Sequence, residues 1–143
     1  MTYKQLSAFG FSGFILSALV HILALSGVYL VSGITVGALT AGMLAAWLFS
    51  GRMLKEQPHT EANPLKAIFT QTPSGLRYAF YFILVYALVN AAFALPVRTG
   101  AGYVDLEITT AKVRLLSGFW LLFYAFAFVT GMALGKNNRK DGV

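Results

Sequence analysis

His21 is a titratable ring in a long tract without formal charge. It lies in the sequence SALVHILALSG, and no Asp, Glu, Lys or Arg occurs between Lys4 and Arg52. Imidazole can carry a proton, coordinate a metal or haem iron, or form hydrogen bonds through both ring nitrogens. The second histidine, His59, falls in a polar segment, so a haem with two axial histidines is not predicted. We interpret His21 as a structural hydrogen-bonding group or as a functional one, either a proton carrier or a ligand to a bound group.

Four other polar side chains have similarly apolar surroundings. Ser17 lies four residues before His21, and Tyr86 lies four residues before Asn90, so each pair shares one face of a helix. Tyr124 belongs to an aromatic row near the C-terminus. His21 and Asn90 come at similar distances along two apolar segments that would run in the same direction, which places them at similar depth. We expect them to hydrogen-bond to each other, since an unsatisfied polar group in hydrocarbon is costly.

The remaining residue types argue against catalysis. The chain has no cysteine, which removes disulfides, thiolate nucleophiles and cysteine-ligated metals. None of the long apolar segments holds a carboxylate, and the acids Asp105 and Glu107 lie in a polar segment without a nearby histidine. We therefore predict no catalytic site, no metal site and no cofactor, and a chain that is not an enzyme.

The composition places these residues in a membrane. Apolar residues make up 57% of the chain and charged residues 11%, whereas soluble domains carry about a quarter charged residues. Too few polar groups are present to cover a globular surface. The net charge of +6 is spread over ends and polar segments, so we expect membrane lipids as partners and no nucleic acid.

We predict an all-α integral membrane protein in which residues 1–143 form a single four-helix bundle. A membrane helix needs about 20 apolar residues, so the uncharged tract before Arg52 suits two helices with a turn at Val31, Ser32 and Gly33. The first apolar stretch exceeds the core of a signal peptide, and we expect it to be retained. The four helices are predicted at about residues 8–30, 34–49, 78–95 and 115–134, joined by a cytoplasmic loop at 50–77 and an outer loop at 96–114.

The loop at 50–77 is predicted to hold a short helix. Asn63 can cap it, and Pro64 suits its first position. Leu65, Ile68 and Phe69 would then share one face. We expect this segment to lie on the lipid head groups as a connector. The alternative is a docking helix for a partner.

The basic residues predict the orientation. Of the 11 Lys and Arg residues, eight fall in the N-terminus, residues 50–77 and the C-terminal tail, and three fall in residues 96–114. Positive residues favour the cytoplasmic side. Both termini are therefore predicted to be cytoplasmic, in a membrane that is most simply the bacterial inner membrane.

The second predicted helix carries small residues at a spacing of four. Such rows let another helix approach closely, within one chain or between copies. The two rows are Gly33, Gly37 and Ala41, and Ala38, Gly42 and Ala46.

Three functional classes are consistent with these features. The first is a non-enzymatic accessory or structural membrane protein, as a homo-oligomer or in a larger membrane complex. The second is a small oligomeric transporter or channel in which His21 and Asn90 line the path. The third is a quinone- or lipid-binding membrane protein, for which the aromatic row Tyr78, Phe82 and Tyr86 offers a surface. The absence of catalytic residue types favours the first class.

Overall fold

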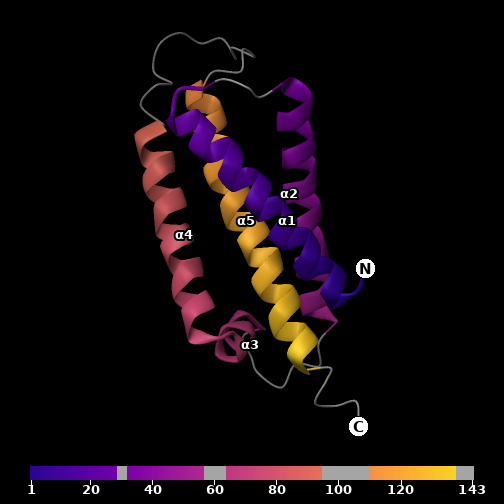
Figure 1. The fold of residues 1–143 in the computed structure, drawn as a ribbon. Helices are drawn as coiled ribbons and strands as arrows, with labels where there is room; N and C mark the ends of the chain where they lie inside the picture. Colours follow the sequence, from indigo (N-terminus) through magenta and orange to yellow (C-terminus); the bar gives the residue numbers. More distant parts are fainter. Residues whose placement is uncertain (29–31, 57–63, 95–109, 138–143) are drawn as a thin grey trace.

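The computed structural model of the chain describes residues 1–28, 32–56, 64–94 and 110–137. These residues form five α-helices and no strand (Figure 1): α1 (Tyr3–Leu25), α2 (Gly33–Lys55), α3 (Pro64–Gln71), α4 (Ser74–Ala94) and α5 (Thr110–Asn137). All except α3 are long and apolar enough to cross a membrane. The all-helical prediction and the four long apolar helices are confirmed. His59, Asn63 and most of the segment predicted as the outer loop lie outside the described residues.

The first helix begins and ends earlier than predicted. Thr2 caps it with a capping box, in which the Gln5 amide donates to the Thr2 hydroxyl at 3.3 Å and the Thr2 amide donates to Oε1 of Gln5 at 2.8 Å. The helix ends at Leu25, and Gly27 follows with a φ of +74°. This left-handed conformation suits glycine and stops a helix.

The other long helices extend beyond the predicted limits. Ser32 caps α2 by accepting a hydrogen bond from the Thr35 amide at 3.3 Å, and α2 continues through Arg52 to Lys55. The starts of α4 and α5 likewise precede the apolar segments that predicted them. Hydropathy marks the part of a helix that suits lipid, whereas caps and backbone hydrogen bonds set where the helix ends.

The short helix predicted in the polar loop is confirmed as α3, but it does not simply lie on a surface. Ile68 is 1% exposed and packs with Phe80 of α4 and with Ala125 and Val129 of α5. Leu65, by contrast, is exposed. The helix is therefore anchored against the bundle through Ile68.

The central element of the bundle is α5. Of the 18 most apolar consecutive residues of α5, 56% are buried. The corresponding segments are 28% buried in α1 and 17% buried in both α2 and α4. One hydrophobic cluster joins α5 to α1 and α2, and a second joins it to α3 and α4. Figure 1 shows α5 crossing behind α1, with α2 and α4 on opposite sides. Fewer than a third of the residues in these segments of α1, α2 and α4 are therefore buried inside the bundle.

Two glycines allow α1 and α5 to pack closely in antiparallel directions. A Cβ atom at Gly131 of α5 would lie 2.6 Å from the backbone nitrogen of Ser7. A Cβ atom at Gly10 of α1 would likewise meet the backbone of Phe128. No side chain fits between these backbones, so the closest helix pair is formed by α1 and α5 and not by the small-residue rows of α2.

Candidate functional site

His21 joins three helices near the end of the bundle opposite the termini. The ring is 4% exposed. Its Nδ1 is hydrogen-bonded to Oγ of Ser117 on α5 at 2.7 Å, and its Nε2 is hydrogen-bonded to the hydroxyl of Tyr86 on α4. The His21 and Tyr86 rings also meet edge to face, with centroids 5.4 Å apart.

The neighbouring hydrogen bonds determine which atom donates and which accepts in the two hydrogen bonds of the His21 ring. The Ser117 hydroxyl donates to the carbonyl oxygen of Arg114 at 3.1 Å. Because a hydroxyl has one proton to donate, Ser117 must accept from Nδ1–H of His21. The neutral ring then has an unprotonated Nε2, which accepts from the Tyr86 hydroxyl. The arrangement is self-consistent for a neutral His21 with its proton on Nδ1.

Asn90 extends the same set of contacts on α4. Its Nδ2 donates to the Arg114 carbonyl oxygen at 2.9 Å, and Nε of Arg114 donates to its Oδ1 at 3.2 Å. Gly118 leaves room for the amide, since a Cβ atom there would lie 2.8 Å from Nδ2 of Asn90. We name the set His21, Tyr86, Asn90, Arg114 and Ser117 the polar network.

The predicted bond between His21 and Asn90 is wrong. The two residues belong to the polar network, but Ser117 and the Arg114 carbonyl stand between them. The prediction rested on the similar depth of the two residues along α1 and α4. The sequence did not indicate that α5 lies between those helices. Arg114 was missed because the predicted fourth helix began at residue 115, which left Arg114 in a loop. Ser117 lay inside that predicted helix but was not identified as a candidate. Their spacing of three residues places both on one face at the start of α5, and this was the sequence signal that could have identified them.

The other two candidate residues lie apart from the polar network. Ser17 is buried and donates to the carbonyl oxygen of Gly13 in its own helix at 2.7 Å. The Tyr124 hydroxyl donates to the carbonyl oxygen of Leu39 on α2 at 3.0 Å. Tyr124 therefore links α5 to α2 and has a structural position between these helices.

The two small-residue rows of α2 have different surroundings. In the second row, Ala46 is fully buried and Gly42 lies against the Tyr124 ring, although Ala38 is exposed. The first row, Gly33, Gly37 and Ala41, is exposed along its length. A Cβ atom at Gly37 would meet none of the described residues within 4 Å. One row thus partly packs inside the bundle, and the other faces outward.

The polar network connects helices and holds no carboxylate. Within the described part of the chain no three His, Cys, Asp or Glu residues gather where a metal could bind, and the one acid there, Glu56, pairs with Arg52 at 2.9 Å. Both ring nitrogens of His21 and both ends of the Asn90 amide are already hydrogen-bonded. No family model matches this chain, and no curated protein or solved structure matches it either.

Proposed function

We propose that this chain is a multi-pass protein of the bacterial inner membrane, with α1, α2, α4 and α5 crossing the bilayer. The four helices have mean hydropathies between 1.5 and 2.0. Backbone polar groups inside a helix bond to each other, as a lipid environment requires. Lipid would cover the large apolar side chains that the outer helices expose: Ile15, Leu16, Leu19 and Ile22 on α1, Ile34 and Leu48 on α2, and Phe82, Val85, Leu88 and Phe93 on α4.

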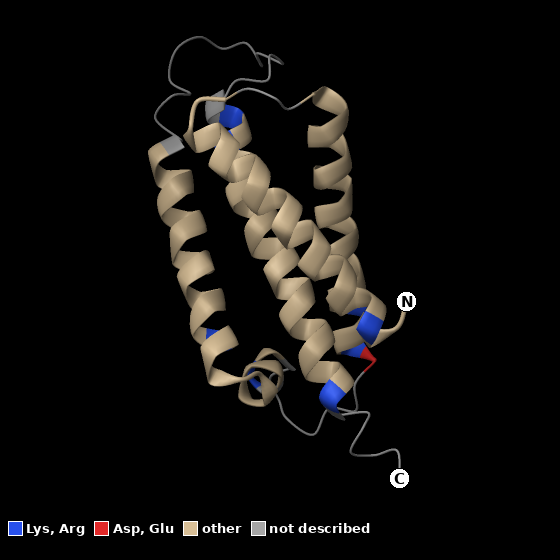
Figure 2. Ribbon diagram, viewed as in Figure 1, with Lys and Arg blue, Asp and Glu red and all other residues tan. Residues whose placement is uncertain are grey.

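The charge distribution supports an orientation with both termini in the cytoplasm. Figure 2 shows most Lys and Arg residues at the end of the bundle that holds the N-terminus, α3 and the end of α5. Of the described basic residues, that end has Lys4, Arg52, Lys55, Lys66, Arg77 and Lys136, while the opposite end has Lys112 and Arg114. The excess of positive charge would face the cytoplasm.

Within that membrane the chain acts as a non-enzymatic accessory subunit that docks against another membrane helix through α2. The observation that carries this proposal is the exposed row Gly33, Gly37 and Ala41. In lipid, small residues at this spacing let two helix backbones approach closely and gain packing contacts. Elsewhere the exposed apolar surface of α1, α2 and α4 includes many bulky side chains that suit lipid tails.

The polar network supports a structural role for His21. Its hydrogen bonds tie α1, α4 and α5 together inside one copy of the chain. A transport path between copies would need His21 and Asn90 on an exposed face, and each is only 4% exposed. The geometry therefore favours the accessory role over transport.

Native mass spectrometry of gently extracted protein at its natural abundance tests the accessory role. We expect a complex that contains a second membrane polypeptide. Gly37→Ile should weaken that complex by about tenfold or more, because the added side chain keeps the partner backbone away. The matched control, Ala92→Ile, places the same side chain on an exposed position of α4 and should leave the complex intact.

A chain that is monomeric under all extraction conditions would reject the accessory role. A complex that both substitutions weaken equally would reject α2 as the docking helix.

A further inference from the structure

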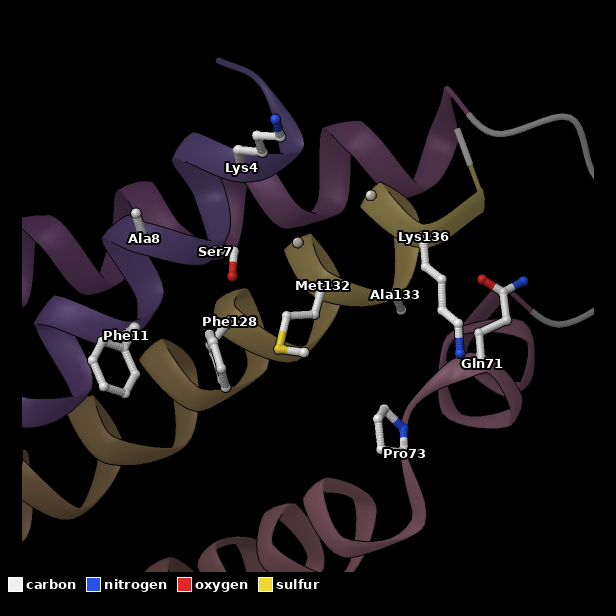
Figure 3. Close-up of a pocket in the computed structure, with 12 residues that line it drawn as sticks. Lys4, Ser7, Ala8, Phe11, Gln71, Pro73, Phe128, Met132, Ala133 and Lys136 are labelled. Carbon is white, nitrogen blue, oxygen red and sulfur yellow. The ribbon is translucent and has the colours of Figure 1, made fainter. Parts of the chain in front are cut away.

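A cavity of about 680 Å³ lies at the end of the bundle that holds the termini, far from the polar network. Its walls come from the start of α1, the α3–α4 connection and the end of α5 (Figure 3). The volume is in the range of small-molecule sites, about 300–1,000 Å³. Six of its lining residues are apolar: Ala8, Phe11, Pro73, Phe128, Met132 and Ala133. Such a wall suits a hydrocarbon chain.

Two lysines give the cavity positive charge. Lys4 comes from the first turn of α1 and Lys136 from the last turn of α5, and both line the cavity. Among the described residues neither ammonium group forms an ion pair, since the acid present there, Glu56, pairs with Arg52. These two cations would attract an anionic group at the end of an apolar ligand.

Gln71 adds a hydrogen-bond acceptor to the same end. Figure 3 shows the Lys136 side chain extending toward Gln71 and Pro73. The Oε1 atom of Gln71 is buried and has no hydrogen-bond partner among the residues that the structure describes, and a buried acceptor is normally satisfied. A ligand that carries a hydroxyl donor beside its negative charge would supply that hydrogen bond.

We propose that this cavity binds one anionic glycerophospholipid with a hydroxylated head group, of the phosphatidylglycerol type. The phosphate is attracted by the charges of Lys4 and Lys136, a head-group hydroxyl donates to Gln71, and an acyl chain lies along Phe11, Phe128 and Met132. This inference rests on the membrane location proposed above but not on the docking role of α2. The basic end of the bundle is also where lipid head groups would lie in the proposed orientation.

Native mass spectrometry in an uncharged detergent tests the lipid site, with equal amounts of phosphatidylglycerol and phosphatidylcholine that have the same acyl chains. We expect the unaltered chain to retain one phosphatidylglycerol molecule in preference to phosphatidylcholine. The variant K4Q/K136Q should lose about tenfold or more of this preference, because both phosphate contacts are removed. The matched variant R52Q/K55Q removes two exposed positive charges at the same end of the bundle and should keep the preference.

A second pair of variants tests the apolar part of the cavity without changing charge. Ala8 is exposed and lines the cavity, so Ala8→Trp should fill it and abolish retention of either lipid. Ala79→Trp places the same ring on an exposed position of α4 outside the cavity and should retain phosphatidylglycerol. Circular dichroism of each variant verifies that the helices are intact.

Three outcomes would overturn the lipid site: equal retention of both lipids by the unaltered chain, an equal loss of preference in both charge variants, or lipid retention by a folded Ala8→Trp variant. Alkaline carbonate extraction of membranes that contain the chain distinguishes failure of the lipid site from failure of the proposed membrane location. A chain that resists extraction but shows no lipid preference rejects only the lipid site. A chain that is extracted rejects both.

Discussion

At the residue scale, His21 depends on neighbours that come from two other helices. Its two nitrogens bond to Ser117 of α5 and Tyr86 of α4. Interhelical hydrogen bonds in membranes average about 0.6 kcal/mol and reach about 1.7 kcal/mol in measured cases. His21 therefore contributes moderately to stability, and its larger effect is to fix how α1 and α4 sit against α5.

We predict that His21→Leu lowers the free energy of unfolding by about 1–2 kcal/mol, because two hydrogen bonds are lost and the Tyr86 hydroxyl is left without this partner. Reversible unfolding in mixed micelles measures the change. In double-mutant cycles His21→Leu should couple to Ser117→Ala by about 0.6 kcal/mol and less strongly to Asn90→Leu. Stronger coupling to Asn90 than to Ser117 would contradict the arrangement of the polar network.

The proton of His21 is predicted to lie on Nδ1. Nitrogen-15 NMR of the labelled ring distinguishes a protonated from an unprotonated imidazole nitrogen, and we expect Nε2 to be the unprotonated one. Tyr86→Phe removes the hydroxyl that donates to Nε2 and should shift the Nε2 resonance more than that of Nδ1. A ring with its proton on Nε2 would mean that Ser117 donates to Nδ1 and does not donate to the Arg114 carbonyl.

At the element scale, the close pair formed by α1 and α5 determines the bundle. Gly10 and Gly131 allow the two backbones to meet, and α5 then offers its remaining faces to α2 and α4. Most of the polar groups that tie the long helices together lie on α5: Ser117 and Arg114 face α1 and α4, while Tyr124 and Trp120 bond to α2.

We predict that Gly131→Ala destabilises the chain by about 1–3 kcal/mol, because its methyl group would lie 2.6 Å from the Ser7 nitrogen. Gly51→Ala is the matched control, since a Cβ atom there meets nothing within 4 Å in the described part of the chain and alanine favours a helix. It should leave stability unchanged or raise it. Thermal unfolding of both variants in the same detergent gives the comparison, and equal destabilisation would reject the close packing of α1 on α5.

The sequence predicted each long helix but not which helices pack together. Uncharged tracts and caps are local features, and they located the long helices and the short α3. The pairing of α1 with α5 joins opposite ends of the chain, and no local pattern encodes it. A partial signal was present in Gly131 and Gly135, which are four residues apart in α5, a spacing that lets another helix approach closely. The candidate site followed the same pattern: His21, Tyr86 and Asn90 were identified, whereas their link through α5 was not.

At the scale of the whole molecule, one end of the bundle differs in charge from the other. The end that holds the start of α1 and the end of α5 carries Lys4, Lys136 and the proposed lipid cavity. The opposite end carries the polar network and fewer basic residues. In the proposed orientation the cavity faces the cytoplasmic leaflet and the polar network lies toward the outer one.

Because the chain has no cysteine, single cysteines can report this orientation. We predict that Ser26→Cys, at the end of α1, reacts with a membrane-impermeant maleimide added to intact spheroplasts. Glu56→Cys, at the end of α2, should react only after the membrane is permeabilised. Both residues are exposed. The reverse labelling pattern would invert the orientation and place the termini outside.

The docking role of α2 is tested most directly in the native membrane, by placing a photo-reactive amino acid at residue 37. Val85 of α4, which is 59% exposed, is the matched position on a bulky apolar face. We predict that illumination joins residue 37, and not residue 85, to a second polypeptide of defined mass. No adduct from residue 37, or equal adducts from both positions, would contradict the assignment of α2 as the docking helix.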